Sequence, residues 1–332
     1  MQPLLSLKNF LRTVSIPIFV GLVLSVILIK PIEKKVFFEV KKGESLKMIA
    51  KDLKEKGLIE DYFGFILLAK ILGAEKKLQP GWYSLSTKSS PMGVLNALSK
   101  GKRIITKVTI PEGLNIEQIA HILRRKAKID SLYFVLLCRD RKFISGLGIN
   151  EETLEGYLLP DTYFVPLSED ASVVIRGLVA NLFRFMRPYT NKMRKLGKDM
   201  HVILTIASLV EKEAMVDNEK PIISSVIYNR LKKGMRLQID ATVQYAMGEH
   251  KSRILFSYLT IDSPYNTYRI KGLPPGPICN PGRKSILAAL FPAKTDYFYY
   301  VARGDGTHIF SRTFSEHKKA KFRVKRNQSK RR

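Results

Sequence analysis

Two stretches of the chain repeat one pattern of apolar and polar positions, 70 residues apart. Residues 40–53 and residues 110–123 each begin with a β-branched residue and pass a glycine, Gly43 or Gly113. They continue with apolar side chains three and four positions apart. This pattern predicts a strand, a glycine turn and an amphipathic helix in each stretch. We therefore expect an internal repeat, although any strand–turn–helix unit would give a similar pattern.

The segment between the two stretches predicts one more strand. Residues 78–85 read as a turn into a strand that carries Trp82, the only tryptophan of the chain. The indole ring could stack on a sugar. A place in the core or at an interface is the simpler expectation.

The second half of the chain alternates helical patterns with irregular segments. Residues 154–166 are rich in aromatic and turn residues, and Pro160 interrupts any helix there. Apolar residues at helical spacing predict helices over about 171–198 and about 219–233. Between them, residues 202–210 are apolar on all sides, which is typical of a helix buried inside a domain.

The C-terminal part reads as a loop, a hairpin and a basic tail. The loop, rich in proline and glycine, begins near residue 260, and a short helix is expected over 285–289. Strands over 297–302 and 308–310 flank the turn Gly304-Asp305-Gly306. The tail, 318–332, holds nine basic residues and no acid, so we expect a solvated, frayed end.

The N-terminal segment is uncharged over 17 residues, from Thr13 to Ile29. That length is near the lower limit for a membrane-spanning helix. A cleaved signal peptide is the alternative, but no small-x-small cleavage site follows the apolar run. We expect a single-pass anchor over 13–30 in the cytoplasmic (inner) membrane and a cytoplasmic N-terminus over 1–12. The rest of the chain would be extracytoplasmic, because large domains translocate largely regardless of local charge.

Composition adds a strong positive charge. Of 332 residues, 57 are Lys or Arg and 29 are Asp or Glu, so the formal net charge is +28. Such a charge indicates anionic surroundings: nucleic acid, an anionic membrane or an acidic polymer. No recognised nucleic-acid-binding motif is present, so we expect no nucleic-acid partner. The 45% share of hydrophobic residues excludes global disorder, and the length is that of about two domains.

Candidate chemistry is concentrated after the apolar run 202–210, where Glu211 and Glu213 follow. Burial raises the pKa of a carboxyl group, and a protonated Glu can act as a general acid on a glycosidic oxygen. Residues two apart on a helix point about 200° apart, so only one of the two can face a given cleft, and the pattern does not decide which. The simpler alternative is a polar helix end with one Glu paired to a cation. The five scattered histidines and two cysteines suggest no metal site.

Six short motifs of the second half occur in a fixed order. They are LEGYLLPDTY at 154–163, ASLVEKE at 207–213, NRL at 229–231, MRLQID at 235–240, YNTY at 265–268 and GLPPGPI at 272–278. The first copy of the repeat also resembles a LysM module. Together with the anchor, this set resembles the endolytic murein transglycosylase family, also called YceG-like. The likeness extends over about residues 36–317.

The resemblance implies an enzyme that cleaves peptidoglycan strands internally, outside the cytoplasmic membrane, and leaves 1,6-anhydro-N-acetylmuramic acid ends. Glu213 matches the family's essential glutamate, and Glu211 is the reserve candidate. One acid is sufficient for this chemistry because the C6 hydroxyl of the substrate is the nucleophile, whereas a hydrolase needs a second carboxylate. The implied partners are glycan strands, the membrane and the wall-synthesis machinery. Cofactors and metals are not required.

The same motifs supply the expected glycan cleft. Aromatic faces and hydrogen-bonding groups would come from Tyr163, Asn229, Gln238, Asp240, Tyr265, Asn266, Thr267 and Tyr268, while Glu155 and Asp161 would position the cleft or tune Glu213. For each residue taken singly, a structural role is an equal alternative. Asp240 could also serve as a second carboxylate, so hydrolysis stays open.

We therefore expect an α+β protein with an N-terminal transmembrane helix. A small LysM-like α/β module over 36–105, a larger mixed α+β catalytic domain over 106–317 and the basic tail would follow. The leading function is a lytic transglycosylase that helps terminate glycan elongation. The alternative is a non-catalytic wall-binding protein that uses the LysM-like module. A disulfide between Cys138 and Cys279 is not implied.

Overall fold

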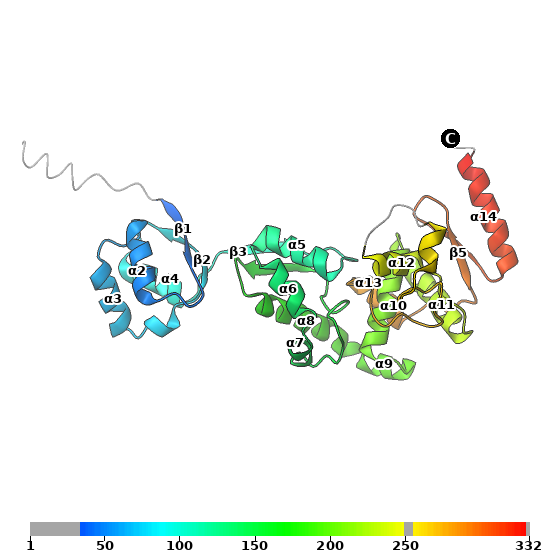
Figure 1. Cartoon of the computed structure of the whole chain (residues 1–332), viewed down its shortest axis with the longest axis horizontal. Helices are drawn as coiled ribbons and strands as arrows, with labels where there is room; N and C mark the ends of the chain where they lie inside the picture. Colours follow the sequence, from blue (N-terminus) through cyan, green and yellow to red (C-terminus); the bar gives the residue numbers. More distant parts are fainter. Residues whose placement is uncertain (1–33, 249–254, 330–332) are drawn as a thin grey trace, which may run out of the picture. The chain divides into compact units, whose positions relative to one another are not determined.

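The computed structural model describes residues 34–248 and 255–329 (Figure 1). The chain divides between Ile104 and Ile105 into two compact units. Helices and short strands occur in both, and the described strands form three separate two-stranded antiparallel sheets. The expected mixed α+β class is confirmed at this level.

The first unit has two helices between the strands of one antiparallel pair. Its elements are β1 (Lys35–Val40), α2 (Leu46–Glu55), α3 (Tyr62–Ile71), η1 (Glu75–Lys77), β2 (Gly81–Ser86) and α4 (Pro91–Ser99). β1 pairs with β2 over its whole length. Phe38 and Tyr83, one from each strand, are fully buried in a core that belongs to this unit alone. Trp82 is half-buried on β2.

The second copy of the repeated pattern begins the second unit. Its elements are β3 (Ile105–Thr109), α5 (Ile116–Ala127), α6 (Ser131–Leu137), α7 (Arg141–Ser145) and β4 (Thr162–Pro166), and β3 pairs with β4. Both turn glycines of the repeat have positive φ, 81° at Gly43 and 77° at Gly113. Glycine adopts this conformation without steric cost. The predicted strand, turn and helix are confirmed in both stretches.

The single helix expected over 171–198 is wrong. α8 (Ala171–Met186) is followed by η2 (Arg187–Tyr189) and then by α9 (Thr190–Leu196). Pro188 has no amide hydrogen and its ring clashes with the preceding turn, so it cannot continue α8. The chain continues as a 3₁₀ turn and then starts a new helix.

The helix α10 (Met200–Glu213) runs through the core of the second unit. Every residue from Ile203 to Val210 is buried, as the apolar run predicts. α10 packs against α13 (Arg283–Leu290) and α11 (Lys220–Lys232), and also contacts α12 (Asp240–Met247). η3 (Asp217–Glu219) and η4 (Phe256–Thr260) are short, and the proline-rich loop that follows η4 is irregular, as expected.

The predicted C-terminal hairpin is confirmed. It consists of β5 (Tyr299–Ala302) and β6 (His308–Ser311). The expectation of a frayed tail from Lys318 is wrong for residues 318–329, which belong to α14 (Phe314–Ser329). The buried residues His317 and Ala320 hold this helix against the hairpin, and the His317 ring stacks on Tyr299.

The expected anchor over 13–30 and the N-terminus before it lie outside the described residues. Among the helices that the structure describes, none is both long and apolar enough to cross a membrane.

Candidate active site

The helix α10 ends at Glu213, where the backbone leaves the helical conformation. Asp199 caps the start of the helix by accepting a hydrogen bond from the Val202 amide at 2.8 Å. After the last turn, Ala214 has an extended backbone with φ −88° and ψ 119°. The polar residues 211–213 thus close a helix whose middle is buried, and each side chain points in its own direction.

Glu213 is held by the C-terminal hairpin. The Tyr300 hydroxyl of β5 donates a hydrogen bond to Glu213 Oε2 at 2.8 Å. No other donor in the described part of the chain is bonded to this carboxyl group, and the residue keeps partial contact with solvent. One oxygen is therefore fixed by Tyr300, and the other accepts no hydrogen bond from the described residues.

The surroundings raise the pKa of Glu213 above its ordinary value. Burial is the largest cause, and the negative charge of Asp240 acts in the same direction. The hydrogen bond from Tyr300 and the positive charges of His308 and Arg230 act to lower the pKa, but they do not cancel the effect of burial. Protonation of Glu213 is thus favoured relative to an ordinary glutamate, as a general acid requires.

Glu211, the reserve candidate, has a different environment. Its Oε2 accepts a hydrogen bond from the Gly282 amide at the start of α13 at 2.8 Å. Its Oε1 lies 3.5 Å from Nζ of Lys220, a buried lysine of α11. Both oxygens of Glu211 therefore join α10 to its neighbouring helices. The two acids thus differ in their surroundings: Glu211 is bonded to two neighbouring helices, and Glu213 is bonded to the C-terminal hairpin.

Two predicted residues share the environment of Glu213. Tyr268 donates a hydrogen bond to Asp240 Oδ1 at the exposed start of α12. Burial, the bond to Asp240 and the negative charge of Glu213 raise the pKa of Tyr268. Asp240 is thus oriented by a phenol and is close enough to influence Glu213 electrostatically.

The hairpin contributes residues that the sequence analysis did not single out. Tyr300 and His308 lie with their ring centroids 5.4 Å apart. Both carboxylate oxygens of Glu219 face His308, one at 2.7 Å from Nδ1 and the other accepting from the amide at 3.0 Å. The alternation of a β-strand could have placed Tyr300 and His308 on one face of the hairpin. No local pattern indicates that this face meets α10.

Three predicted glycan-binding residues support the backbone instead. Asn229 donates to two carbonyls within 295–297, at 2.9 Å each. Asn266 is fully buried and donates to two carbonyls within 259–261. Thr267, also fully buried, bonds an amide and a hydroxyl beside α12. The structure does not bring these three side chains to Glu213, and the structural alternative fits them.

Glu155 lies in the interior and not beside Glu213. Its two oxygens accept hydrogen bonds from the Ile116 amide at 3.3 Å and from Asn280 Nδ2 at 2.7 Å. Burial raises the pKa of Glu155 to about 8, although these two hydrogen bonds act to lower it. The residue connects the start of α5 to the proline-rich loop.

The remaining predicted residues are distributed over the second unit. Asp161 and Tyr163 are bonded to the same side-chain amide of α8, at 3.4 and 3.1 Å. Gln238 is exposed and has a positive φ of 51°. The ring of Tyr265 packs on that of Tyr245 at 4.8 Å between centroids. Within the predicted set, the structure therefore brings Asp240 and Tyr268 to Glu213.

The groups assembled at the end of α10 are suited to proton transfer. They are the carboxyl groups of Glu213 and Asp240 and the phenols of Tyr268 and Tyr300. Over residues 34–248 and 255–329, no group of three or more His, Cys, Asp or Glu side chains is arranged to hold a metal ion. Cys138 and Cys279 are both buried free thiols.

Known sequences are similar to this chain over most of its length. The model of the YceG-like family matches residues 38–323. A Bacillus subtilis (strain 168) protein named endolytic murein transglycosylase is 36% identical over 316 residues, which cover 89% of this chain and 87% of that protein. A Streptococcus pneumoniae (serotype 2, strain D39) protein of the same name is 30% identical over 301 residues. This match covers 81% of the chain but only 54% of the pneumococcal protein.

A solved structure agrees as well. The crystal structure of a yceG-like protein from Listeria monocytogenes matches with a TM-score of 0.61 and 36% sequence identity. The match covers 86% of this chain and 99% of that one. Since the family model and the Bacillus relative both extend over most of the sequence, the chain belongs to the YceG-like family.

Proposed function

We propose that this protein is a membrane-anchored endolytic lytic transglycosylase. It would cleave the bond between N-acetylmuramic acid and N-acetylglucosamine within nascent strands and leave 1,6-anhydro ends, which helps terminate glycan elongation. Family membership and the names of the relatives support the reaction class. The observation that carries the proposal is Glu213 itself, with a raised pKa, one oxygen held by Tyr300 and the other bonded to none of the described residues.

The first step uses Glu213 as an acid. The protonated carboxyl group donates its proton to the glycosidic oxygen between the two sugars, and the bond from that oxygen to C1 of the muramic acid residue breaks. Positive charge develops on the sugar ring as the leaving sugar departs with the proton. Glu213 becomes a carboxylate, and the hydrogen bond from Tyr300 stabilises this anion.

The second step uses the same residue as a base. The C6 hydroxyl of the muramic acid residue attacks C1, and the Glu213 carboxylate accepts its proton while the anhydro ring closes. The nucleophile is already part of the substrate, so no water has to be activated. Asp240 would keep the pKa of Glu213 high during this cycle. If Asp240 instead activated water, the same site would be a hydrolase.

The first unit and the N-terminal segment would locate the enzyme. We infer that residues 13–30 anchor the chain in the cytoplasmic membrane with both units on the extracytoplasmic side, near wall polymers and the machinery that synthesises them. The first unit would act as a LysM-like module on the glycan. Its separate core and its two helices between paired strands fit an independent binding module.

A digest of purified sacculi with the full-length protein in detergent tests the proposal. Mass spectrometry of the soluble products separates three outcomes. Anhydro ends that disappear in a Glu213→Gln variant support the lytic transglycosylase. New reducing ends would indicate a hydrolase. Binding to sacculi without any new ends would favour the non-catalytic wall-binding alternative.

A further inference from the structure

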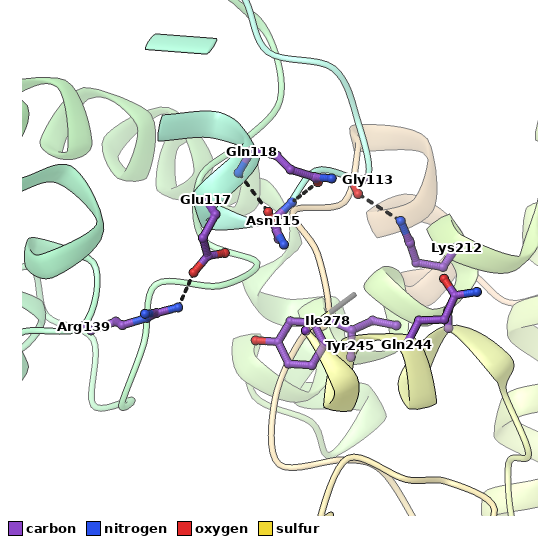
Figure 2. Close-up of a pocket in the computed structure, with 11 residues that line it drawn as sticks. Gly113, Asn115, Glu117, Gln118, Arg139, Lys212, Gln244, Tyr245 and Ile278 are labelled. Atoms are coloured by element: carbon purple, nitrogen blue, oxygen red, sulfur yellow. Dashed lines mark hydrogen bonds and ion pairs between the residues drawn. The ribbon is translucent and has the colours of Figure 1, made fainter. Parts of the chain in front are cut away.

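A cavity of about 650 Å³ lies in the second unit between α5, α10 and α12. Figure 2 shows Asn115 and Gln118, from the start of α5, on one side of it and Gln244 and Tyr245 of α12 on the other. Glu213 does not line the cavity, and neither does any site residue predicted from the sequence. The residues assigned to the Glu213 site therefore do not account for this cavity.

The helix α12 contacts both the Glu213 site and the cavity. Asp240, the first residue of this helix, influences Glu213 electrostatically. Gln244 lines the cavity four residues later, and residues four apart lie on the same helix face, about one turn away. At the end of α10, Lys212 lines the cavity and directly precedes Glu213. A polymer bound at Glu213 would therefore also pass close to this cavity.

The polar groups of the α5 side are mainly donors. Asn115 and Gln118 form a capping box in which the side-chain oxygen of each accepts a backbone hydrogen bond, at 2.9 and 3.0 Å. The amide NH₂ group of each side chain therefore remains as a donor. Lys212 adds a cation, and its contact within the described residues is the Gly113 carbonyl at 3.3 Å.

Among the residues that the structure describes, none forms an ion pair with Lys212. Glu117 is the acid among the lining residues, and it forms an ion pair with Arg139, another lining residue (Figure 2). Tyr245 supplies an aromatic face, which the ring of Tyr265 supports. A pocket with an aromatic face, amide donors and one unmatched cation complements a sugar that carries a carboxylate.

We propose that this cavity binds a carboxylate of the wall glycan, carried beside an N-acetylated sugar. Lys212 pairs with the carboxylate, Asn115 and Gln118 donate to it or to the acetamido carbonyl, and the sugar ring packs on Tyr245. The lactyl carboxylate of a peptide-free strand and the acidic groups of a stem peptide share this chemistry. The inference rests on the proposed function for its ligand, and it makes Lys212 a residue that distinguishes muramic acid polymers from plain N-acetylglucosamine polymers.

Binding measurements test this proposal with the full-length protein in detergent and the Glu213→Gln change, so that strands are not consumed. The probes are uncrosslinked peptidoglycan strands with stem peptides, the same strands stripped of peptides, and chito-oligosaccharides, which have acetamido groups but no carboxylate. Lys212→Gln should weaken binding to a muramyl probe by about tenfold, because a hydrogen-bonded charge pair is lost. Chito-oligosaccharide affinity should be unchanged.

Two matched variants serve as controls for Lys212→Gln. Lys212→Arg keeps the charge and should retain most of the affinity. Lys195→Gln removes an equal charge from an exposed position of α9 and should have no effect. A further variant, Glu117→Gln, releases Arg139 and should strengthen binding of the muramyl probe a few-fold, because a second cation becomes available.

The pattern of losses identifies the source of the carboxylate. A loss confined to peptide-bearing strands assigns it to the stem peptide, and a loss with the stripped strands assigns it to the lactyl group. Equal losses with all three probes, no loss with any, or weaker binding in Glu117→Gln would overturn the proposal. Failure of the proposed function would be seen separately, as the absence of anhydro ends from the protein with Glu213 intact.

Discussion

Tyr300 and Glu213 form a hydrogen bond of 2.8 Å that joins β5 to the last residue of α10. The phenol donates to one carboxylate oxygen, which orients the group and stabilises its anion. Burial and Asp240 act in the opposite sense and raise the pKa of Glu213. A residue that first donates a proton and then accepts one needs opposing influences on its pKa, so that neither the protonated nor the ionised form is too stable.

Glu213→Gln should abolish the release of anhydro ends. The glutamine can still accept a hydrogen bond from Tyr300, but it has no acidic proton to donate. General acid–base catalysis contributes about 10²–10⁴ in rate, so turnover should fall by at least about 100-fold. Mass spectrometry of sacculus digests measures the products, and an unchanged unfolding temperature shows that the fold is intact. Full activity would remove Glu213 from the mechanism.

Glu211→Gln should affect stability more than chemistry. The change removes the charge that faces buried Lys220 and weakens the bond to the Gly282 amide. We expect the free energy of unfolding to fall by about 1–3 kcal/mol, measured by denaturant titration. Turnover per folded molecule should stay close to that of the unmodified protein. Intact stability with lost turnover would reverse the assignment of the two acids.

Tyr300→Phe should shift the pH profile of cleavage. The hydrogen bond from Tyr300 lowers the pKa of Glu213, so its loss raises that pKa further. The basic limb of the profile should therefore move to higher pH. The rate at the optimum should fall by about tenfold, because a bond to a charged group is lost. A lower rate with an unmoved profile would mean that Tyr300 only supports the fold.

Asp240→Asn should shift the same profile in the opposite direction. The negative charge of Asp240 raises the pKa of Glu213, so its removal lowers that pKa and moves the basic limb to lower pH. The pH dependence of turnover on sacculi measures this shift, and product analysis accompanies it. If the unmodified protein makes reducing ends that Asp240→Asn no longer makes, Asp240 is the base for water and the reaction is hydrolysis.

Glu155 should make the stability of the protein depend on pH. Its pKa in the folded protein, about 8, lies above the ordinary value of 4.5, so the folded state binds the proton more tightly than the unfolded chain does. This stabilisation is complete below about pH 4.5 and is lost as the pH rises toward 8. The unfolding temperature should therefore decline over this range, and Glu155→Gln should flatten the decline. Equal slopes for both proteins would show that Glu155 is not the source.

Residues 200–213 show what a local sequence pattern can predict and what it cannot. The apolar run predicts a buried helix, and carboxyl groups at its end stand out in the sequence. The difference between the two acids depends on groups 71 and 87 residues further along the chain, the Gly282 amide and the Tyr300 hydroxyl. Periodicity contains no information about such pairings, because they arise only when α13 and the hairpin pack against α10.

Two corrections have different causes. Pro188 ends a helix whose apolar spacing continues past it, so a single covalent feature overrides the periodic pattern. The basic tail looks like a solvated end by composition, yet residues 318–329 are helical because His317 and Ala320 are buried against the hairpin. Tertiary contacts of a few side chains therefore order a segment that its charge alone would not.

The sequence by itself determined the α+β class, the repeated strand–turn–helix units, the buried helix and the family motifs. These features depend on residue type and spacing along the chain. Local backbone preferences and apolar periodicity follow directly from these two properties. The tertiary structure alone decided that Tyr300 binds one oxygen of Glu213, while both oxygens of Glu211 are engaged. It also decided that Asn229, Asn266 and Thr267 support the backbone. The cavity beside Lys212 is likewise a feature of the fold alone. Each of these outcomes depends on the direction of a side chain relative to a distant segment, and folding sets that direction.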